Sequence, residues 1–277
     1  MIDMGIFSGL LLVSDFDGTL IGSDKKISGE NLEAIRYFTE NGGLFSGATG
    51  RTQFNLRMYL EGLPLDTPYI LYNGACLYDF SAGTMLRMMP LKREPIMSIM
   101  NAIMARFPSV CIHLYTPRDL FLVNPLGRED WHLTVEKQSF QQGDAGQIGE
   151  PWIKMLFFEE NELLRKIQAI IAEADKSGDY HTFFSDETYL EVTRRGVNKG
   201  SALIELKEEL KGKVRKVIAI GDYLNDLEML EQADIKVAPM NAHPKIKRLA
   251  DHITAPHDSH AIAALIAWLE RSVKQSR

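Results

Sequence analysis

The sequence contains only two cysteines, Cys76 and Cys111, which lie far apart among its 277 residues. They are too few for a disulfide framework, which excludes a small disulfide-stabilised fold and favours a reducing compartment. No apolar run approaches the roughly 20 residues that a membrane-spanning helix needs. The first residues carry no basic flank and include the acidic Asp3, so they do not resemble a secretory signal. These absences predict a cytoplasmic protein with no membrane partner.

The chain also lacks an excess of positive charge. Its 31 lysines and arginines stand against 37 aspartates and glutamates, a formal net charge of −6. Such mild acidity argues against a protein that coats nucleic acid. Hydrophobic residues make up 45% and charged residues 25% of the chain, which is close to the globular average and excludes a largely disordered protein. At about 100 to 200 residues per domain, the length indicates two domains or one large one.

Short apolar runs alternate with helical patterns at the start of the chain and again near its end. Residues 10–13 are typical of a strand buried on both faces, and Ser28 can cap a helix that the segment 41–43 ends. The same alternation predicts strands at 44–48, 69–72, 217–220 and 235–237, and helices at 54–60, after 196–198, and at 261–273. This order is typical of a parallel sheet built from right-handed βαβ units.

The rhythm changes in the middle of the chain. A hairpin is predicted at 76–88, followed by helix 96–107, strands 110–115 and 120–123, a helix near Trp131, strand 152–158, helix 163–174 and a last hairpin. We therefore predict an α/β protein with a Rossmann-like parallel sheet core and helices on both faces. The core consists of residues 1–83 and 194–277, and residues 84–193 form an inserted α/β domain.

Polar side chains stand where four of the predicted strands end. They are Asp15 and Asp17, Thr49, Asn73, and Asp222. Lys199 opens the helix before the last of these strands. Ligands of open α/β sheets bind beyond the carboxyl ends of the strands, so these groups are candidates for one site.

Three aspartates brought together would repel one another unless a cation lay between them. Oxygen ligands alone favour a hard ion, which makes Mg²⁺ the predicted cofactor. A cation beside a lysine, a hydroxyl and backbone amides exposed by glycines is a place for phosphate.

Four segments resemble the motifs of the haloacid dehalogenase superfamily. They are Asp-Phe-Asp-Gly-Thr at 15–19, Ala-Thr-Gly-Arg at 48–51, Gly-Val-Asn-Lys-Gly at 196–200, and Gly-Asp-Tyr-Leu-Asn-Asp at 221–226. The long insertion between the second and third motifs, with Asn73-Gly74-Ala75 before it, resembles the Cof-type phosphatases of subfamily IIB, which carry a large α/β cap there. The resemblance covers nearly the whole chain.

The resemblance implies a role for each motif. Asp15 is implied as the nucleophile and Asp17 as the acid that protonates the leaving oxygen and then the base that activates water. Thr49 and Lys199 are implied to hold the phosphoryl oxygens. These four residues form the predicted catalytic set.

The same resemblance implies a metal site and its surroundings. Asp15, Asp222 and the backbone carbonyl of Asp17 are implied as Mg²⁺ ligands, and Asp226 as a support that binds metal waters or holds Lys199. The remaining candidate contacts to substrate or phosphate are Phe16, Gly50, Arg51, Asn73, Gly74 and Asn225. For three of these an ordinary alternative stays open: Arg51 could pair with a local carboxylate, Asn225 could cap its helix, and Asn73-Gly74 could be only a turn.

We therefore predict a Mg²⁺-dependent phosphatase that hydrolyses small phosphate monoesters, such as sugar phosphates, through an aspartyl-phosphate. The alternative is a non-catalytic or regulatory phosphate-binding relative of the same fold, although no reactive position is substituted. A receiver-type signalling domain is a single small domain and does not fit the length. A dehalogenase of the same superfamily would not need Asp17.

Overall fold

A computed structural model describes residues 5–125, 133 and 139–275 of the chain. The chain divides into two compact units, Met1–Leu86 with Asn198–Arg277, and Arg87–Val197. Each unit has its own hydrophobic core. The helix predicted near Trp131 lies outside the described residues.

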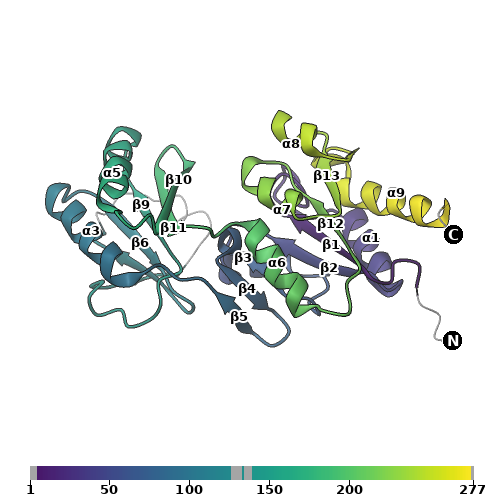
Figure 1. Cartoon of the computed structure of the whole chain (residues 1–277), viewed down its shortest axis with the longest axis horizontal. Coiled ribbons are helices and arrows are strands. Elements are labelled where there is room, and N and C mark those ends of the chain that lie inside the picture. Colours follow the sequence, from purple (N-terminus) through teal and green to yellow (C-terminus); the bar gives the residue numbers. More distant parts are fainter. Residues whose placement is uncertain (1–4, 126–132, 134–138, 276–277) are drawn as a thin grey trace. The chain divides into compact units, whose positions relative to one another are not determined.

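The first unit is built on an eight-stranded sheet in the order β14-β13-β12-β1-β2-β3-β4-β5 (Figure 1). Its parallel strands are β1 (Leu10–Asp15), β2 (Leu44–Ala48), β3 (Tyr69–Leu71), β12 (Lys216–Ile220), β13 (Ile235–Pro239) and β14 (His252–Thr254). The hairpin β4 (Cys76–Asp79) and β5 (Thr84–Met88) extends the sheet, with β4 antiparallel to β3. The predicted parallel α/β core is thus confirmed.

Helices cover the sheet of the first unit. Helices α6 (Lys199–Glu209), α7 (Leu227–Glu231) and α8 (Pro244–Leu249) share a core with Leu11 and Val13 of β1. Leu12 points to the opposite face, because side chains alternate along a strand, and it is also fully buried. Helices α1 (Gly29–Glu40) and α9 (Ala261–Gln275) pack against each other. Burial on both faces explains why the strand sequences are continuous apolar runs.

A side-chain cap begins α1 where it was predicted, whereas α2 differs from the prediction in length. The Ser28 hydroxyl accepts the backbone N–H of Asn31 at 3.3 Å and begins α1, as predicted. The helix predicted at 54–60 is shorter than expected: α2 (Gln53–Leu56) continues only as a 3₁₀ turn, η1 (Arg57–Tyr59). A segment of this length has few i→i−4 hydrogen bonds to form, and such ends tighten readily into 3₁₀ turns.

The second unit is a six-stranded sheet in the order β10-β11-β9-β6-β7-β8. The strands are β6 (Cys111–Tyr115), β7 (Leu120–Val123), β8 (Gln141–Gln142), β9 (Lys154–Phe158), β10 (Tyr180–Asp186) and β11 (Tyr189–Arg194). Helices α3 (Arg93–Arg106) and α5 (Asn161–Ala174) pack on the face that carries Ile112, Leu114, Met155, Phe157 and Leu190 (Figure 1). These residues alternate along their strands, so one sheet face forms this core.

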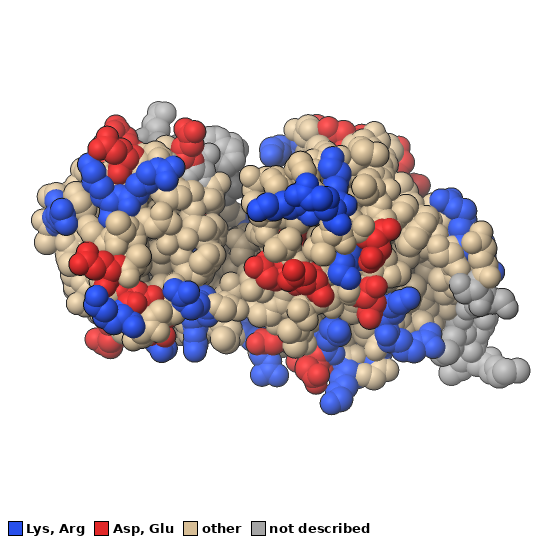
Figure 2. Space-filling view, turned by 45° about the horizontal axis from the view of Figure 1, so that its top comes forward, with Lys and Arg blue, Asp and Glu red and all other residues tan. Residues whose placement is uncertain are grey.

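Two further observations concern the surface charge and the length of the apolar helices. Lysines and arginines are interspersed with aspartates and glutamates over the face seen in Figure 2, so neither sign dominates there. None of the helices in the described part of the chain is long and apolar enough to cross a membrane.

Candidate active site

The polar ends of three parallel strands meet at one edge of the first unit's sheet. Asp15 is the last residue of β1, Thr49 directly follows β2, and Asp222 lies two residues beyond β12. Backbone hydrogen bonds hold these loops in register: Thr49 N–H donates to Ile70 O at 2.9 Å, and Asn73 N–H donates to Thr49 O at 2.9 Å. Parallel pairing of β1 with both β2 and β12 therefore brings the first, second and fourth motifs to one place.

A fully buried lysine lies at the centre of this edge. Lys199 Nζ donates to Asp15 Oδ1 at 2.5 Å and to Asp226 Oδ1 at 2.6 Å. Lys199 is the first residue of α6, and the cap before it is strong: Asn198 Oδ1 accepts the Ser201 N–H, and the Ser201 hydroxyl accepts the Asn198 N–H. This capping box fixes where the helix begins and hence where Lys199 stands.

Three carboxylates surround the lysine. One oxygen from each of Asp15, Asp222 and Asp226 lies within 4.8 Å of the others. Asp226 Oδ2 accepts the backbone N–H groups of Asp222 and Tyr223 at 2.9 and 3.1 Å, and the Thr19 hydroxyl donates to Asp222 Oδ1 at 3.2 Å. Asp226 therefore both contacts Lys199 and shapes the loop of the fourth motif.

Burial and neighbouring charges shift the pKa values of this cluster. Burial, and then the negative charge of Asp226, raise the pKa of Asp15 well above its usual value, although Lys199 opposes the shift. Burial, and then Asp226, likewise raise the pKa of Asp222 to about 6. Burial alone would lower the pKa of Lys199, but Asp15 and Asp226 outweigh burial and raise it. Excess negative charge is thus concentrated in a small buried volume.

These residues fit a divalent cation. Three carboxylates face one lysine, so two negative charges are left uncompensated when all are ionised. The donors are all oxygens, as a hard ion prefers. The side-chain ligands that the geometry offers are Asp15, Asp222 and Asp226. The side chain of Asp17 bonds Arg51 instead, so the predicted contribution of Asp17 to a metal ion would have to come from its backbone carbonyl.

The Asp17 carboxylate is paired with Arg51. Arg51 Nε donates to Asp17 Oδ2 and Arg51 Nη2 to Asp17 Oδ1, both at 2.8 Å. The Arg51 side chain is 15% exposed and that of Asp17 45%. Of the two alternatives that the sequence left open for Arg51, pairing with a local carboxylate is the one present here.

Asn73 and Gly74 form a strained turn against the other loops. Tyr72, Asn73 and Gly74 have φ values of 53°, 53° and 102°, a left-handed run that non-glycine residues rarely adopt. The Asn225 amide donates to Asn73 Oδ1 at 3.3 Å. A Cβ on Gly74 would lie 2.1 Å from the Asn198 carbonyl oxygen, so only glycine fits beside the residue before Lys199.

Other predicted contacts have a more restricted role. The Phe16 side chain is fully buried and its ring lies 6.3 Å from that of Tyr69, so only its backbone could meet a phosphate. Gly50 lies close to the side chain of Asn73. A Cβ at position 50 would be 2.9 Å from the Asn73 amide nitrogen.

Sequence reasoning missed two contributors to the site. Thr19 belongs to the first motif, yet its hydroxyl bond to Asp222 could not be assigned from the motif alone. Asn241 Nδ2 donates to Gly18 O at 2.8 Å, next to Asp17. Asn241 belongs to no motif and lies 223 positions away, so no sequence signal identified it.

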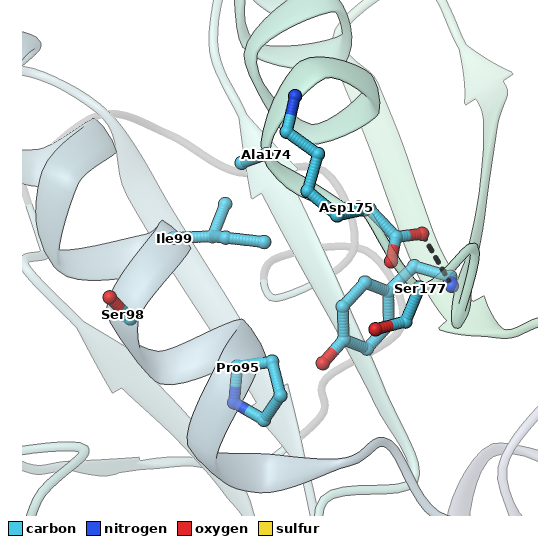
Figure 3. A pocket seen from close by; sticks show the side chains of 8 residues that line it. Pro95, Ser98, Ile99, Ala174, Asp175 and Ser177 are labelled. Atoms are coloured by element: carbon cyan, nitrogen blue, oxygen red, sulfur yellow. Dashed lines mark hydrogen bonds between the residues drawn. The ribbon is translucent and has the colours of Figure 1, made fainter.

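A separate pocket of about 280 Å³ lies in the second unit (Figure 3). Its lining comes from α3, from the end of α5 and the turn after it, and from the first residue of β10, and includes Ser98, Asp175 and Tyr180. Both Asp175 oxygens accept backbone N–H groups, from Asp179 and Tyr180, and the Tyr180 hydroxyl donates to Lys92 O. The pocket contains none of the predicted site residues. Both oxygens of its Asp175 carboxylate already accept hydrogen bonds from the turn that follows α5.

Comparison with known proteins identifies the family. Residues 12–266 match the family model of the haloacid dehalogenase-like hydrolases. Because the match spans most of the chain, the protein belongs to this family, and the resemblance seen in the four motifs is confirmed. Its relatives carry the names of phosphatases of this hydrolase family.

Two relatives and two solved structures illustrate the similarity. The 5-amino-6-(5-phospho-D-ribitylamino)uracil phosphatase YcsE of Bacillus subtilis is 28% identical, over 92% of this chain and 94% of its own. The pyridoxal phosphate phosphatase YbhA of Escherichia coli is 26% identical, over 92% and 97%. A haloacid dehalogenase-like hydrolase from Bacteroides thetaiotaomicron aligns with a TM-score of 0.83 at 26% identity, over 94% and 98%. The subclass IIB sugar phosphatase BT4131 shares the fold, with a TM-score of 0.75 at 21% identity, over 94% and 98%.

Proposed function

We propose that this chain is a Mg²⁺-dependent phosphatase that hydrolyses small phosphate monoesters through an aspartyl-phosphate on Asp15. The observation that supports it most is the buried Lys199, which bonds Asp15 and Asp226 at the edge where Asp222 also lies. A buried cation beside a carboxylate nucleophile is what an incoming phosphate group needs, because it offsets the repulsion between two anions.

The first half-reaction transfers the phosphoryl group to the protein. An oxygen of Asp15 forms a bond to phosphorus while the bond from phosphorus to the leaving oxygen breaks. Asp17, protonated at this stage, gives its proton to the leaving oxygen, so the alcohol departs neutral. Thr49 and Lys199 hold the phosphoryl oxygens, and Lys199 offsets the charge that builds up in the transition state.

The second half-reaction regenerates the protein. Asp17, now ionised, accepts a proton from a water molecule as the water oxygen bonds to phosphorus. The bond between phosphorus and the Asp15 oxygen breaks, which releases inorganic phosphate and restores the carboxylate. Each aspartate returns to its starting protonation state, so the cycle balances.

Asp15, Asp222 and the Asp17 carbonyl would hold Mg²⁺, with Asp226 in support. When bound, the ion supplies positive charge that reduces the repulsion between Asp15 and the phosphoryl oxygens.

The substrate class we propose is small phosphate esters such as sugar phosphates. YcsE and YbhA are named for substrates with quite different leaving groups, a ribitylaminouracil and pyridoxal. We assign the choice of leaving group to the inserted segment predicted as the cap, 84–193, and the location to the cytoplasm, where such metabolites occur. Polar candidates in the cap include Arg118, Lys154 and Glu191, of which Lys154 and Glu191 form a buried ion pair at 2.9 Å.

The decisive experiment is a panel of phosphate monoesters assayed with Mg²⁺, on the wild type and on Asp15→Asn. An amide is a poor nucleophile and a weaker metal ligand, so Asp15→Asn should lose essentially all turnover. Asp66→Asn, an exposed aspartate of the same unit, serves as the matched control and should keep full activity. Wild-type rates for Asp15→Asn would overturn the mechanism, and an inactive wild type that still binds phosphate would favour the non-catalytic alternative.

A further inference from the structure

We propose that Arg51 is a positioning residue that exchanges partners during turnover, holding Asp17 in the resting protein and releasing it when the phosphoryl group of the substrate takes Asp17's place. This inference rests on the proposed phosphatase function, and it concerns how the acid–base residue becomes available.

The Arg51 side chain is held in place before any substrate arrives. Its guanidinium lies 4.9 Å from the ring centre of Tyr59, and its side chain is only 15% exposed. The backbone is fixed as well: Arg51 N–H donates to Thr49 Oγ1 at 3.1 Å, and Arg51 O accepts from Tyr72 N–H at 3.1 Å. The guanidinium is thus anchored two residues from the hydroxyl that we assign to the phosphoryl oxygens.

In this position the Asp17 carboxylate cannot act on a leaving group. Two parallel N–H···O bonds of 2.8 Å engage one guanidinium edge with both carboxylate oxygens. A carboxylate held in this bidentate manner cannot direct an oxygen at a leaving group, so the pair has to open once in each catalytic cycle.

A phosphoryl group is the natural competitor for Arg51. The guanidinium fork matches phosphate oxygens as well as it matches a carboxylate, and a phosphate dianion carries more charge than a single carboxylate. Asp17 is 45% exposed, so water is available to solvate it as it leaves, whereas the more buried Arg51 stays anchored. Substrate binding and release of Asp17 would then be one event. The freed carboxylate takes up one proton from solvent before it acts as the acid, and that proton returns to solvent when phosphate leaves and the pair with Arg51 forms again.

A permanent structural pair makes different predictions, and a double-mutant cycle separates the two. The variants are Arg51→Gln, Asp17→Asn and the double variant, assayed on a sugar phosphate and on nitrophenyl phosphate. If a phosphoryl group displaces Asp17 from Arg51, Arg51→Gln raises KM because the fork is lost, and Asp17→Asn lowers KM because the competing carboxylate is lost. In the double variant the lower KM of Asp17→Asn should disappear, because it depends on Arg51, so the two changes are non-additive in KM.

Two further variants control the interpretation. Arg51→Lys keeps the charge but not the fork, so it should recover only part of the KM effect. Arg57→Gln removes an exposed arginine from the neighbouring turn and should change neither KM nor kcat. Independent, multiplying effects of Arg51→Gln and Asp17→Asn on KM would overturn the proposal.

A measurement without turnover tests the exchange directly. The Nε–H resonance of Arg51, assigned by its loss in Arg51→Gln, is followed by NMR while inorganic phosphate is added. We expect it to shift on saturation in the wild type, and we expect Asp17→Asn to shift it without phosphate. An Arg51 resonance unmoved by saturating phosphate would overturn the exchange even in an active enzyme. An exchange seen in a protein that hydrolyses no ester would instead show that the proposed function has failed.

Discussion

At the scale of single residues, the site is a balance of charge around one buried ammonium group. Lys199 is fully buried and lies within 2.6 Å of oxygens from two aspartates, while a third aspartate adds to the negative charge. Removing one partner of a buried ion pair leaves an uncompensated buried charge, which is far more costly than loss of an exposed pair. The free energy of unfolding should therefore depend on Lys199 and on any metal cation that binds beside it.

Replacing Lys199 with methionine tests this balance. The side chain keeps similar bulk but leaves three carboxylates without their buried cation, so we expect a loss of about 3 to 5 kcal/mol in unfolding free energy in EDTA. Mg²⁺ should recover part of that loss, and turnover should stay very low in both conditions. Urea denaturation with and without Mg²⁺ gives the comparison, and an equal loss in both would show that no cation site adjoins Lys199.

The raised pKa of Asp222 predicts a pH dependence of the protein without metal. Its pKa is about 6 in the folded protein against a usual value of 3.8, so between these values the folded state binds more protons than the unfolded state. Unfolding free energy contributed by this group therefore falls as pH rises through about 4 to 6, and stays lower above that.

We expect the Tm of the wild type in EDTA to fall relative to that of Asp222→Asn as the pH rises across this window. Comparing the two proteins removes the contribution of titrating groups outside the cluster, while the pKa of Asp15, which Asp222 also raises, changes with the substitution. With Mg²⁺ the fall should be smaller, because the cation then compensates the ionised carboxylate. A difference in Tm that is constant with pH would contradict a raised pKa at Asp222.

At the scale of elements, helix and strand ends carry the reactive groups, so the signals that end an element also place the chemistry. The capping box of Asn198 and Ser201 sets the first turn of α6 and thereby the position of Lys199. The parallel register of β1 and β2 pairs Asp15 with Ala48, the residue before Thr49. If the start of α6 or the register of β1 with β2 shifted by one residue, Lys199 or Asp15 would no longer lie in the cluster.

Asn198→Ala should reveal this double role. Loss of the cap should lower the unfolding free energy by about 1 kcal/mol and also reduce kcat, because the turn that carries Lys199 loosens. Ser28→Ala removes the N-cap of α1 and should cost similar stability with little effect on kcat. Urea denaturation and steady-state kinetics on both variants supply the comparison. Equal kcat values for Asn198→Ala and Ser28→Ala would show that the Asn198 cap does not affect catalysis.

At the scale of the whole molecule, the two units have separate cores but only one carries the carboxylate cluster. Trp152, which is 1% exposed, belongs to the core of the second unit, whereas Asp15, Asp222 and Asp226 all belong to the first. A ligand that binds only the folded form of one unit stabilises that unit by mass action.

Mg²⁺ should therefore affect the two units unequally. In scanning calorimetry we expect the cation to raise the midpoint of a transition assigned to the first unit by more than one assigned to the second. Phe157→Ala, a cavity-forming change in the second core, should lower the second transition and identify it. A single transition that moves as a whole with Mg²⁺ and with Phe157→Ala would show that the units unfold together.

Local patterns in the sequence were enough to predict most elements. Apolar runs marked the buried strands, and Ser28 and Asn198 marked helix starts. These signals are readable because they depend on neighbours within a few positions, through side-chain periodicity and backbone capping. Helix α8 and strand β14 were not predicted, because segments of six and three residues carry little periodicity.

The sequence by itself determined which chemical groups are present and that they follow strand and helix ends, because motif spacing and local propensity are properties of the chain. Only the tertiary structure decided which groups touch. Lys199 and Asp15 lie 184 positions apart, and Arg51 could have paired with any nearby anion until the fold placed Asp17 against it. Contacts of that kind depend on how parallel strands are ordered in the sheet, since β1 pairs with β12 from the far end of the chain. The charge balance of the buried cluster arises only after that ordering has brought its members together.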